Sequence, residues 1–231
     1  MTRPELSATG LARYFDHTLL RPDATRAGFE RLCQEAVDHG FAMVAINPGP
    51  VAWCKARLAG SAVRVGAAIA FPLGQNTIAQ KVAEAVSAID DGADEIDYVI
   101  DLGRVKDGDL DHSEREMTAM VQACRGRGVL IKVILETCYL TREEKLALAQ
   151  IARRVGPDFV KTSTGFGSGG ATAEDVALLA ANVGPDVQVK ASGGVRSLTD
   201  ALQYIDLGAT RLGSSASVAI VEEYRRSGAS S

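Results

Sequence analysis

The chain has 231 residues, of which 46% are hydrophobic and 23% are charged, and its formal net charge is −4. These are ordinary values for a globular protein, and they exclude a chain that is disordered over most of its length. An acidic balance without a long run of one sign argues against a nucleic-acid-binding protein, which usually shows a basic stripe. It still permits a phosphorylated ligand, because a few local donors suffice for one phosphate.

The predicted elements alternate along the chain. A first strand is predicted near Leu11–His17, before a helix that begins around Ala24. One pattern then recurs seven times: a segment with helical periodicity, a glycine, and a short apolar strand that ends in polar residues. Glycine just past a helix supplies the left-handed cap that other residues adopt only with strain. The glycines of the seven repeats are Gly40, Gly60, Gly92, Gly128, Gly156, Gly184 and Gly208.

Eight strand–helix units in a chain of this length predict a TIM (β/α)8 barrel of parallel strands, preceded by a short N-terminal helix. The alternative is an open, doubly wound sheet, but no G-x-G-x-x-G motif follows the first strand. No linker or shift in composition divides the chain, so one domain is expected over residues 1–231. The tail from Arg225 to Ser231 is expected to be frayed.

Several kinds of site and location are not expected. The cysteines include no C-x-x-C pair, which fits reduced thiols in a cytoplasmic protein. The N-terminus lacks the apolar core of a signal peptide, and no segment reaches the roughly 18 apolar residues of a membrane span. The three histidines, His17, His39 and His112, are scattered. Hence no metal site, no cofactor and no contact with a membrane are predicted.

Two lysines stand at matching places in neighbouring units. Lys161 follows the strand in VGPDFVK and Lys190 follows it in VGPDVQVK. If both point into the barrel mouth, desolvation and the like charge lower the pKa of one of them. A lysine with a pKa of roughly 7–8 is partly a free amine at neutral pH and can form a Schiff base with a carbonyl. The alternative is that each lysine pairs with a carboxylate and closes the barrel end.

Carboxylates and a hydroxyl accompany these lysines. Asp97 lies within an apolar strand and is either an ion-pair partner or a proton carrier for imine chemistry. Asp16 and Thr18 follow the first strand and could bind a substrate hydroxyl, although Asp16 could also be a turn residue. Lys132 lies earlier in its strand, where a buried ion pair with Glu136 or Asp97 is the expected role.

Two glycine-containing loops near the end of the chain indicate a phosphate site. In TIM barrels the loops after strands seven and eight often bind a phosphate, and here they are Ser192–Asp200 and Gly213–Ser217. Glycines let backbone N–H groups approach an anion, and serine hydroxyls can donate to it. The predicted phosphate and substrate residues are Thr164, Gly165, Gly193, Gly194, Gly213, Ser214 and Ser215.

Together these motifs closely resemble the deoxyribose-phosphate aldolase family. The resemblance runs in order from about residue 16 to residue 221 and is carried by DHTLLRPDAT, AFPLGQNT, GADEIDYVI, LIKVILET, DFVKTSTGF, VKASGGVR and RLGSS. It implies a metal-free class I aldolase that interconverts 2-deoxy-D-ribose 5-phosphate with acetaldehyde and D-glyceraldehyde 3-phosphate. It also implies a homo-oligomer, with a dimer as the expected form, and a role in deoxyribonucleoside catabolism.

The resemblance implies a role for each central residue. Lys161 would form the Schiff base, Lys190 would lower its pKa and share proton transfer, and Asp97 would donate and accept protons. The sequence departs from the family at Ala45, where many members carry a cysteine. Rival functions are a Schiff-base aldolase with another donor and a phosphosugar-binding or isomerase barrel that never forms an imine.

Overall fold

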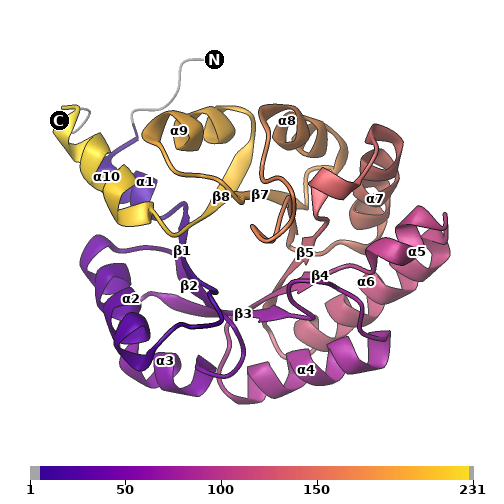
Figure 1. Cartoon of the computed structure of the whole chain (residues 1–231), viewed down its shortest axis with the longest axis horizontal. Helices are drawn as coiled ribbons and strands as arrows, with labels where there is room; N and C mark the ends of the chain where they lie inside the picture. Colours follow the sequence, from indigo (N-terminus) through magenta and orange to yellow (C-terminus); the bar gives the residue numbers. More distant parts are fainter. Residues whose placement is uncertain (1–5, 229–231) are drawn as a thin grey trace.

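The computed structural model describes residues 6–228 and shows a closed barrel of eight parallel strands (Figure 1). The strands pair in chain order, and β1 closes the barrel against β8. The TIM barrel prediction is therefore confirmed. The strands are β1 (Phe15–Leu19), β2 (Met43–Ile46), β3 (Arg64–Ile69), β4 (Glu95–Val99), β5 (Leu130–Ile134), β6 (Phe159–Lys161), β7 (Gln188–Ser192) and β8 (Ala209–Ser214).

Helices form the outer layer around the strands (Figure 1). Capping residues begin several of them, as at Thr77, whose side chain forms a capping box with Gln80. Gly40 and Gly156 end two others in the left-handed conformation. The helices are α1 (Ala8–Ala12), α2 (Arg26–His39), α3 (Val51–Arg57), α4 (Ile78–Asp90), α5 (Leu102–Lys106), α6 (Leu110–Arg125), α7 (Arg142–Val155), α8 (Ala173–Asn182), α9 (Leu198–Asp206) and α10 (Ser217–Arg226), with a 3-10 turn, η1 (Thr137–Tyr139).

Two boundaries differ from the prediction. The first strand begins four residues later than Leu11, because Ser7 caps α1 and places Leu11 in that helix. The short N-terminal helix itself was predicted. At the other end, Arg225 and Arg226 belong to α10, whereas the prediction placed them in a frayed tail. Residues 229–231 of that tail lie outside the described residues.

Alternate strand residues face two different environments. On β3, Val65, Ala67 and Ile69 belong to the hydrophobic core between the strands and the helices. On β4, Ile96 and Tyr98 do the same, whereas Glu95 and Asp97 face the barrel interior. Large aliphatic residues usually fill that interior in barrels of this type. Here charged side chains occupy much of it, and this difference positions the site described below.

No helix within residues 6–228 is both long enough and apolar enough to cross a membrane.

Candidate active site

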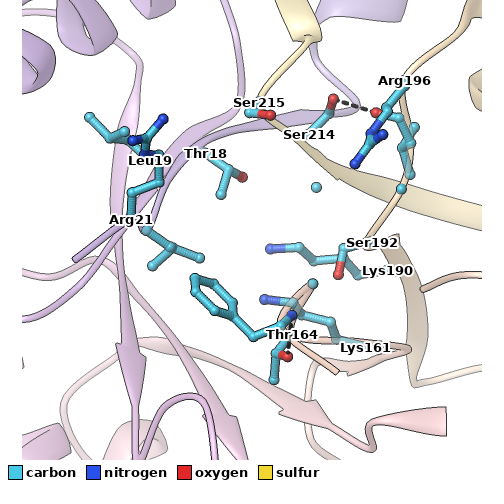
Figure 2. A pocket seen from close by; sticks show the side chains of 17 residues that line it. Thr18, Leu19, Arg21, Lys161, Thr164, Lys190, Ser192, Arg196, Ser214 and Ser215 are labelled. Carbon is cyan, nitrogen blue, oxygen red and sulfur yellow. Dashed lines mark hydrogen bonds between the residues drawn. The ribbon is translucent and has the colours of Figure 1, made fainter. Parts of the chain in front are cut away.

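A cavity of about 270 Å³ opens at the carboxyl ends of β1, β6, β7 and β8 (Figure 2). This is the end of the barrel at which the chemistry of TIM-barrel enzymes takes place. All predicted site residues line the cavity except Asp16 and Asp97, which lie deeper in the barrel. The predicted residues in the lining are Thr18, Lys161, Thr164, Gly165, Lys190, Gly193, Gly194, Gly213, Ser214 and Ser215.

Lys161 and Lys190 are neighbours in register on β6 and β7. Their amine ends point to the same side of the cavity (Figure 2). Both side chains are buried, and both donate hydrogen bonds to the same oxygen of Asp97, Oδ2, at 2.9 Å from Lys161 and 2.7 Å from Lys190. The expectation that the two lysines meet in the barrel mouth is confirmed.

Next to Lys161, six buried side chains of alternating charge, Lys190 among them, form a closed ring, which we call the barrel ring. Each carboxylate in it contacts two of its cations, and each cation contacts two of its carboxylates. A buried charge is tolerated only when it is paired in this way. The members in order are Glu95, Lys132, Asp97, Lys190, Asp16 and Arg211, which contacts Glu95 again.

The β4 side of the barrel ring is centred on Asp97. Its Oδ1 accepts a hydrogen bond from Lys132 Nζ at 2.7 Å, and Lys132 also forms an ion pair with Glu95. The buried ion pair expected between Lys132 and Asp97 is therefore present. Glu136, the other partner proposed from the sequence, instead accepts hydrogen bonds from the backbone and the hydroxyl of Thr164.

The β1 side of the barrel ring is centred on Asp16, which is fully buried. Its two carboxylate oxygens lie 2.6 Å from Arg211 Nη1 and 2.5 Å from Lys190 Nζ. Since Asp16 does not line the cavity, the geometry does not support the predicted contact with a substrate hydroxyl. Thr18, two residues further along β1, does line the cavity, and its hydroxyl donates to the Asp16 carbonyl at 2.9 Å.

The barrel ring leaves Lys161 as an additional cation. The three carboxylates of the barrel ring already face three cations, which are Lys132, Lys190 and Arg211. A protonated Lys161 would therefore be an extra buried positive charge beside Asp97. Burial, together with the like charges of Lys190 and Lys132, lowers the pKa of Lys161 to about 8, although Asp97 opposes this shift. At neutral pH roughly a tenth of Lys161 is therefore the free amine.

The carboxylates of the site remain ionised. Burial opposes ionisation of Asp97, but Lys132, Lys161 and Lys190 hold its pKa well below the usual value. Burial likewise opposes ionisation of Asp16, whose pKa Lys190 and Arg211 nevertheless keep lowered. Burial disfavours the charged form of Lys132 too, yet Asp97 and Glu95 raise its pKa above the normal value. Lys161 thus differs from Lys132 in having a lowered pKa.

The glycine loops form the outer wall of the cavity. Gly165, Gly193 and Gly194 have φ values of 88°, 82° and 79°, a conformation that favours glycine. Ser215 is exposed beside them, and no hydrogen bond of its hydroxyl occurs within the described part of the chain. Ser214 is already engaged, since its hydroxyl donates to the Val195 carbonyl at 2.6 Å and accepts from the Ala216 N–H at 2.9 Å.

Two predicted site residues have a structural function in addition to lining the cavity. The Thr164 hydroxyl donates to Glu136 and accepts from the Phe166 N–H, so it is not free to donate to a ligand. Gly213 makes room for other residues: a Cβ at this position would lie 2.7 Å from Ser192 Cβ and 3.2 Å from Lys190 Cε. A side chain at 213 would therefore push Ser192 away and shift Lys190 by a few tenths of an ångström.

The sequence patterns missed several residues of the site. Three residues that line the cavity, Arg21, Phe166 and Arg196, were not predicted. Each lies within three residues of a predicted site residue in the sequence, and this proximity could have identified them. Arg21 is paired with Asp23, through bonds of 2.9 and 2.6 Å. The barrel-ring members Glu95 and Arg211 were also missed. Each lies two residues from a predicted site residue on the same strand, Asp97 and Gly213 respectively, so alternation places them on the same face.

Known proteins resemble this chain in sequence and in fold. The model of the DeoC/LacD family of aldolases matches residues 11–229. A deoxyribose-phosphate aldolase of Bacteroides thetaiotaomicron is 53% identical over 220 residues, which cover 95% of this chain and 92% of that protein. Another, from Caldanaerobacter subterraneus, is 48% identical over 229 residues, 99% of both proteins. The tetrameric deoxyribose-phosphate aldolase of Aeropyrum pernix superposes with a TM-score of 0.89 at 34% identity, covering 95% of this chain and 92% of that one.

Proposed function

The chain belongs to the DeoC/LacD family of aldolases, and we propose that it cleaves 2-deoxy-D-ribose 5-phosphate reversibly to D-glyceraldehyde 3-phosphate and acetaldehyde through a Schiff base on Lys161. Relatives about half identical to this chain are deoxyribose-phosphate aldolases, which supports the choice of substrate. The observation that carries the proposal is the position of Lys161, which among the described residues is a buried cation of the cavity that the barrel ring does not balance. A free amine in a cavity is the nucleophile that Schiff-base chemistry requires.

The reaction begins with attack of the Lys161 amine on the C1 aldehyde of the ring-opened sugar. Loss of water gives a protonated imine, which is an electron sink. The C2–C3 bond then breaks as the C3 hydroxyl loses its proton, and D-glyceraldehyde 3-phosphate is released. The two-carbon fragment stays on Lys161 as an enamine, is protonated at C2, and is hydrolysed to acetaldehyde.

Lys190 and Asp97 are proposed to move the protons of this cycle. Lys190 lines the cavity and can reach the substrate directly or through a water. Asp97 lies below and contacts both lysines, so it can act as a proton acceptor for either of them. Its pKa, well below the usual value, keeps Asp97 ionised, which suits it to holding the lysines in place. No cofactor takes part in this scheme.

The phosphate is proposed to bind at the outer wall of the cavity. Gly165, Gly193 and Gly194 leave the backbone open to close approach, and Ser215 offers a hydroxyl. The N-terminus of α10 begins at Ser217 and has no side-chain cap at Ala216, so its first N–H groups can face an anion. Arg196 adds a positive charge at the same wall. Thr18 remains a candidate for a substrate hydroxyl.

Borohydride trapping tests reaction class and residue together. The enzyme is incubated with acetaldehyde and sodium borohydride, digested, and analysed by mass spectrometry. The expected result is a reduced two-carbon adduct on Lys161, with no adduct from pyruvate or dihydroxyacetone phosphate. An adduct with either of those donors would identify a different Schiff-base aldolase. Retained turnover in Lys161→Arg would overturn the imine mechanism itself, because arginine cannot form the imine.

Assembly, pathway and location are further parts of the proposal. A homodimer is expected from the family, and light scattering coupled to size-exclusion chromatography would measure it. The proposed reaction assigns the enzyme to deoxyribonucleoside catabolism. Cys33, Cys54, Cys124 and Cys138 are all free thiols, as is usual in the reducing cytoplasm.

A further inference from the structure

Glu95 and Arg211 occupy the part of the barrel ring that lies away from the cavity. Neither residue lines the cavity, so neither is placed to touch the substrate. Glu95 is fully buried and Arg211 is 9% exposed. Arg211 Nη1 lies 3.3 Å from Glu95 Oε2 and 2.6 Å from Asp16 Oδ1, so this guanidinium joins the two carboxylates. The proposed mechanism gives neither residue a function.

The surroundings of the pair stabilise the positive charge of Arg211. Arg211 lies over the ring of Phe159 at 5.2 Å from the centroid, and Lys132 lies 5.8 Å from the same centroid. An aromatic face stabilises cations through its quadrupole without adding a charge. Burial disfavours the charged guanidinium, but Asp16 and Glu95 raise the pKa of Arg211. Arg64, which is half exposed, also donates to Glu95 at 3.0 Å.

We propose that Glu95 and Arg211 are positioning residues that set whether Lys161 is a free amine, because they fix the number of charges in the barrel ring. The proposal rests on the proposed function of Lys161 as the Schiff-base nucleophile. Lys161 is faced by Asp97 from β4, Lys132 from β5 and Lys190 from β7. Arg211 and Glu95 act on it through these groups: Glu95 pairs with Lys132, and Arg211 shares Asp16 with Lys190.

The two residues have opposite effects. Without the Arg211 charge, Lys132, Lys190 and Lys161 would face three carboxylates, so protonation of Lys161 would complete the balance. Without the Glu95 charge, the same lysines and Arg211 would face only Asp97 and Asp16, which favours the free amine. A unit charge about 10 Å away in a medium with an effective dielectric constant of about 20 shifts a titration by roughly one pH unit.

The test measures the pH at which borohydride trapping of acetaldehyde on Lys161 is half-maximal. Arg211→Met is expected to raise this midpoint by about one pH unit, and Glu95→Gln to lower it by about one. The double variant is expected to return close to the wild-type midpoint. Arg211→Lys, which keeps the charge, is expected to stay there as well. The matched control is Glu114→Gln/Arg154→Met, an exposed ion pair on α6 and α7 whose removal is expected to leave the midpoint unchanged.

The outcomes separate the possible explanations. If Glu95 and Arg211 only support the fold, the variants lose yield or rate while the midpoint stays where it is, and the proposal is wrong. Shifts of both single variants in the same direction would also overturn it. If Arg211→Met does not fold, Glu95→Gln decides the question by itself, because its midpoint must fall. Failure of the wild-type enzyme to form any adduct on Lys161 would instead refute the proposed function.

Discussion

Asp97 and Lys161 are joined by a hydrogen bond of 2.9 Å to Oδ2, an oxygen that also accepts from Lys190 at 2.7 Å. The other oxygen of Asp97 accepts from Lys132 at 2.7 Å. One carboxylate shared by three amines cannot neutralise all of them. Lys190 and Lys132 each have a second carboxylate, Asp16 and Glu95 respectively, whereas Asp97 is the single ion-pair partner of Lys161 among the described residues. Lys161 is therefore the amine whose positive charge has no carboxylate of its own.

The first prediction concerns the pH dependence of Schiff-base formation. Because the pKa of Lys161 is lowered to about 8, its amine fraction rises with pH through that value. Trapping of acetaldehyde is expected to increase between pH 7 and 9, by roughly tenfold per pH unit on the acidic side. In Lys190→Leu, loss of the neighbouring like charge leaves Asp97 more available to protonated Lys161. The midpoint of trapping in Lys190→Leu is therefore expected at a higher pH than in the unchanged enzyme. If the pH profiles of the two enzymes coincide, this explanation is wrong.

Glu136 provides the second prediction. This buried carboxylate has φ 52° and accepts from the N–H of Thr164 at 3.1 Å, which orders the turn that contains Gly165. Glu136→Ala leaves two buried donors unpaired, at a cost of about 1–3 kcal/mol. The KM for deoxyribose 5-phosphate is expected to rise about tenfold while kcat changes less. Glu136→Gln keeps one acceptor and serves as the milder control; an unchanged KM in the alanine variant would show that the turn does not depend on Glu136.

The third prediction uses the close approach at Gly213. A methyl group there would lie 3.2 Å from Lys190 Cε and 2.7 Å from Ser192 Cβ. Gly213→Ala is therefore expected to push Ser192 away and to shift Lys190 by a few tenths of an ångström. The expected fall in kcat is about tenfold, smaller than the hundredfold effect of a misplacement of about 1 Å. The folded state is expected to persist, as judged by circular dichroism. Wild-type turnover in this variant would show that the neighbouring strands adjust without moving Lys190.

The fourth prediction concerns tolerance of acetaldehyde. Ala45 lies opposite Thr18 in the register of β1 and β2, and Thr18 lines the cavity. A thiol at position 45 would add a nucleophile beside the reactive aldehyde, so Ala45→Cys is expected to lose activity in acetaldehyde faster than the unchanged enzyme. Cys138 is partly exposed near Gly167, so the comparison is repeated in a Cys138→Ser background. Equal inactivation rates in both backgrounds would refute the prediction.

The fifth prediction concerns stability. Lys81 on α4 and Glu116 on α6 form a fully buried ion pair, and Lys81 also donates to the Val99 carbonyl at 2.8 Å. Glu116→Leu leaves the ammonium unpaired, and the free energy of unfolding in urea is expected to fall by about 3–5 kcal/mol. Lys81→Met/Glu116→Leu removes both charges. It loses the bonds to Val99 and Asp101, about 1–2 kcal/mol in total, and the contact of Lys81 with the Tyr98 ring. A double variant less stable than the single one would contradict this account.

The sequence by itself determined the barrel and the two cavity lysines. The repeated glycine-to-strand pattern requires parallel strands, and parallel strands bring their carboxyl ends to one edge. Lys161 and Lys190 end matching units, so they had to become neighbours. The strand boundary near Leu11 was placed too early, because an apolar run does not distinguish the end of a capped helix from the start of a strand.

Only the tertiary structure decided how the charges are distributed. Asp16 and Arg211 are 195 residues apart in the chain, yet they lie 2.6 Å apart across the junction of β1 and β8. Local periodicity contains no information about such a pair, because closing the barrel creates the contact. The same closure turns Glu95 and Arg211 into partners and leaves Lys161 without a second carboxylate. The family resemblance already named Lys161 as the Schiff-base residue. The physical reason for its lowered pKa, a ring whose carboxylates are all paired with other cations, exists only in the folded chain.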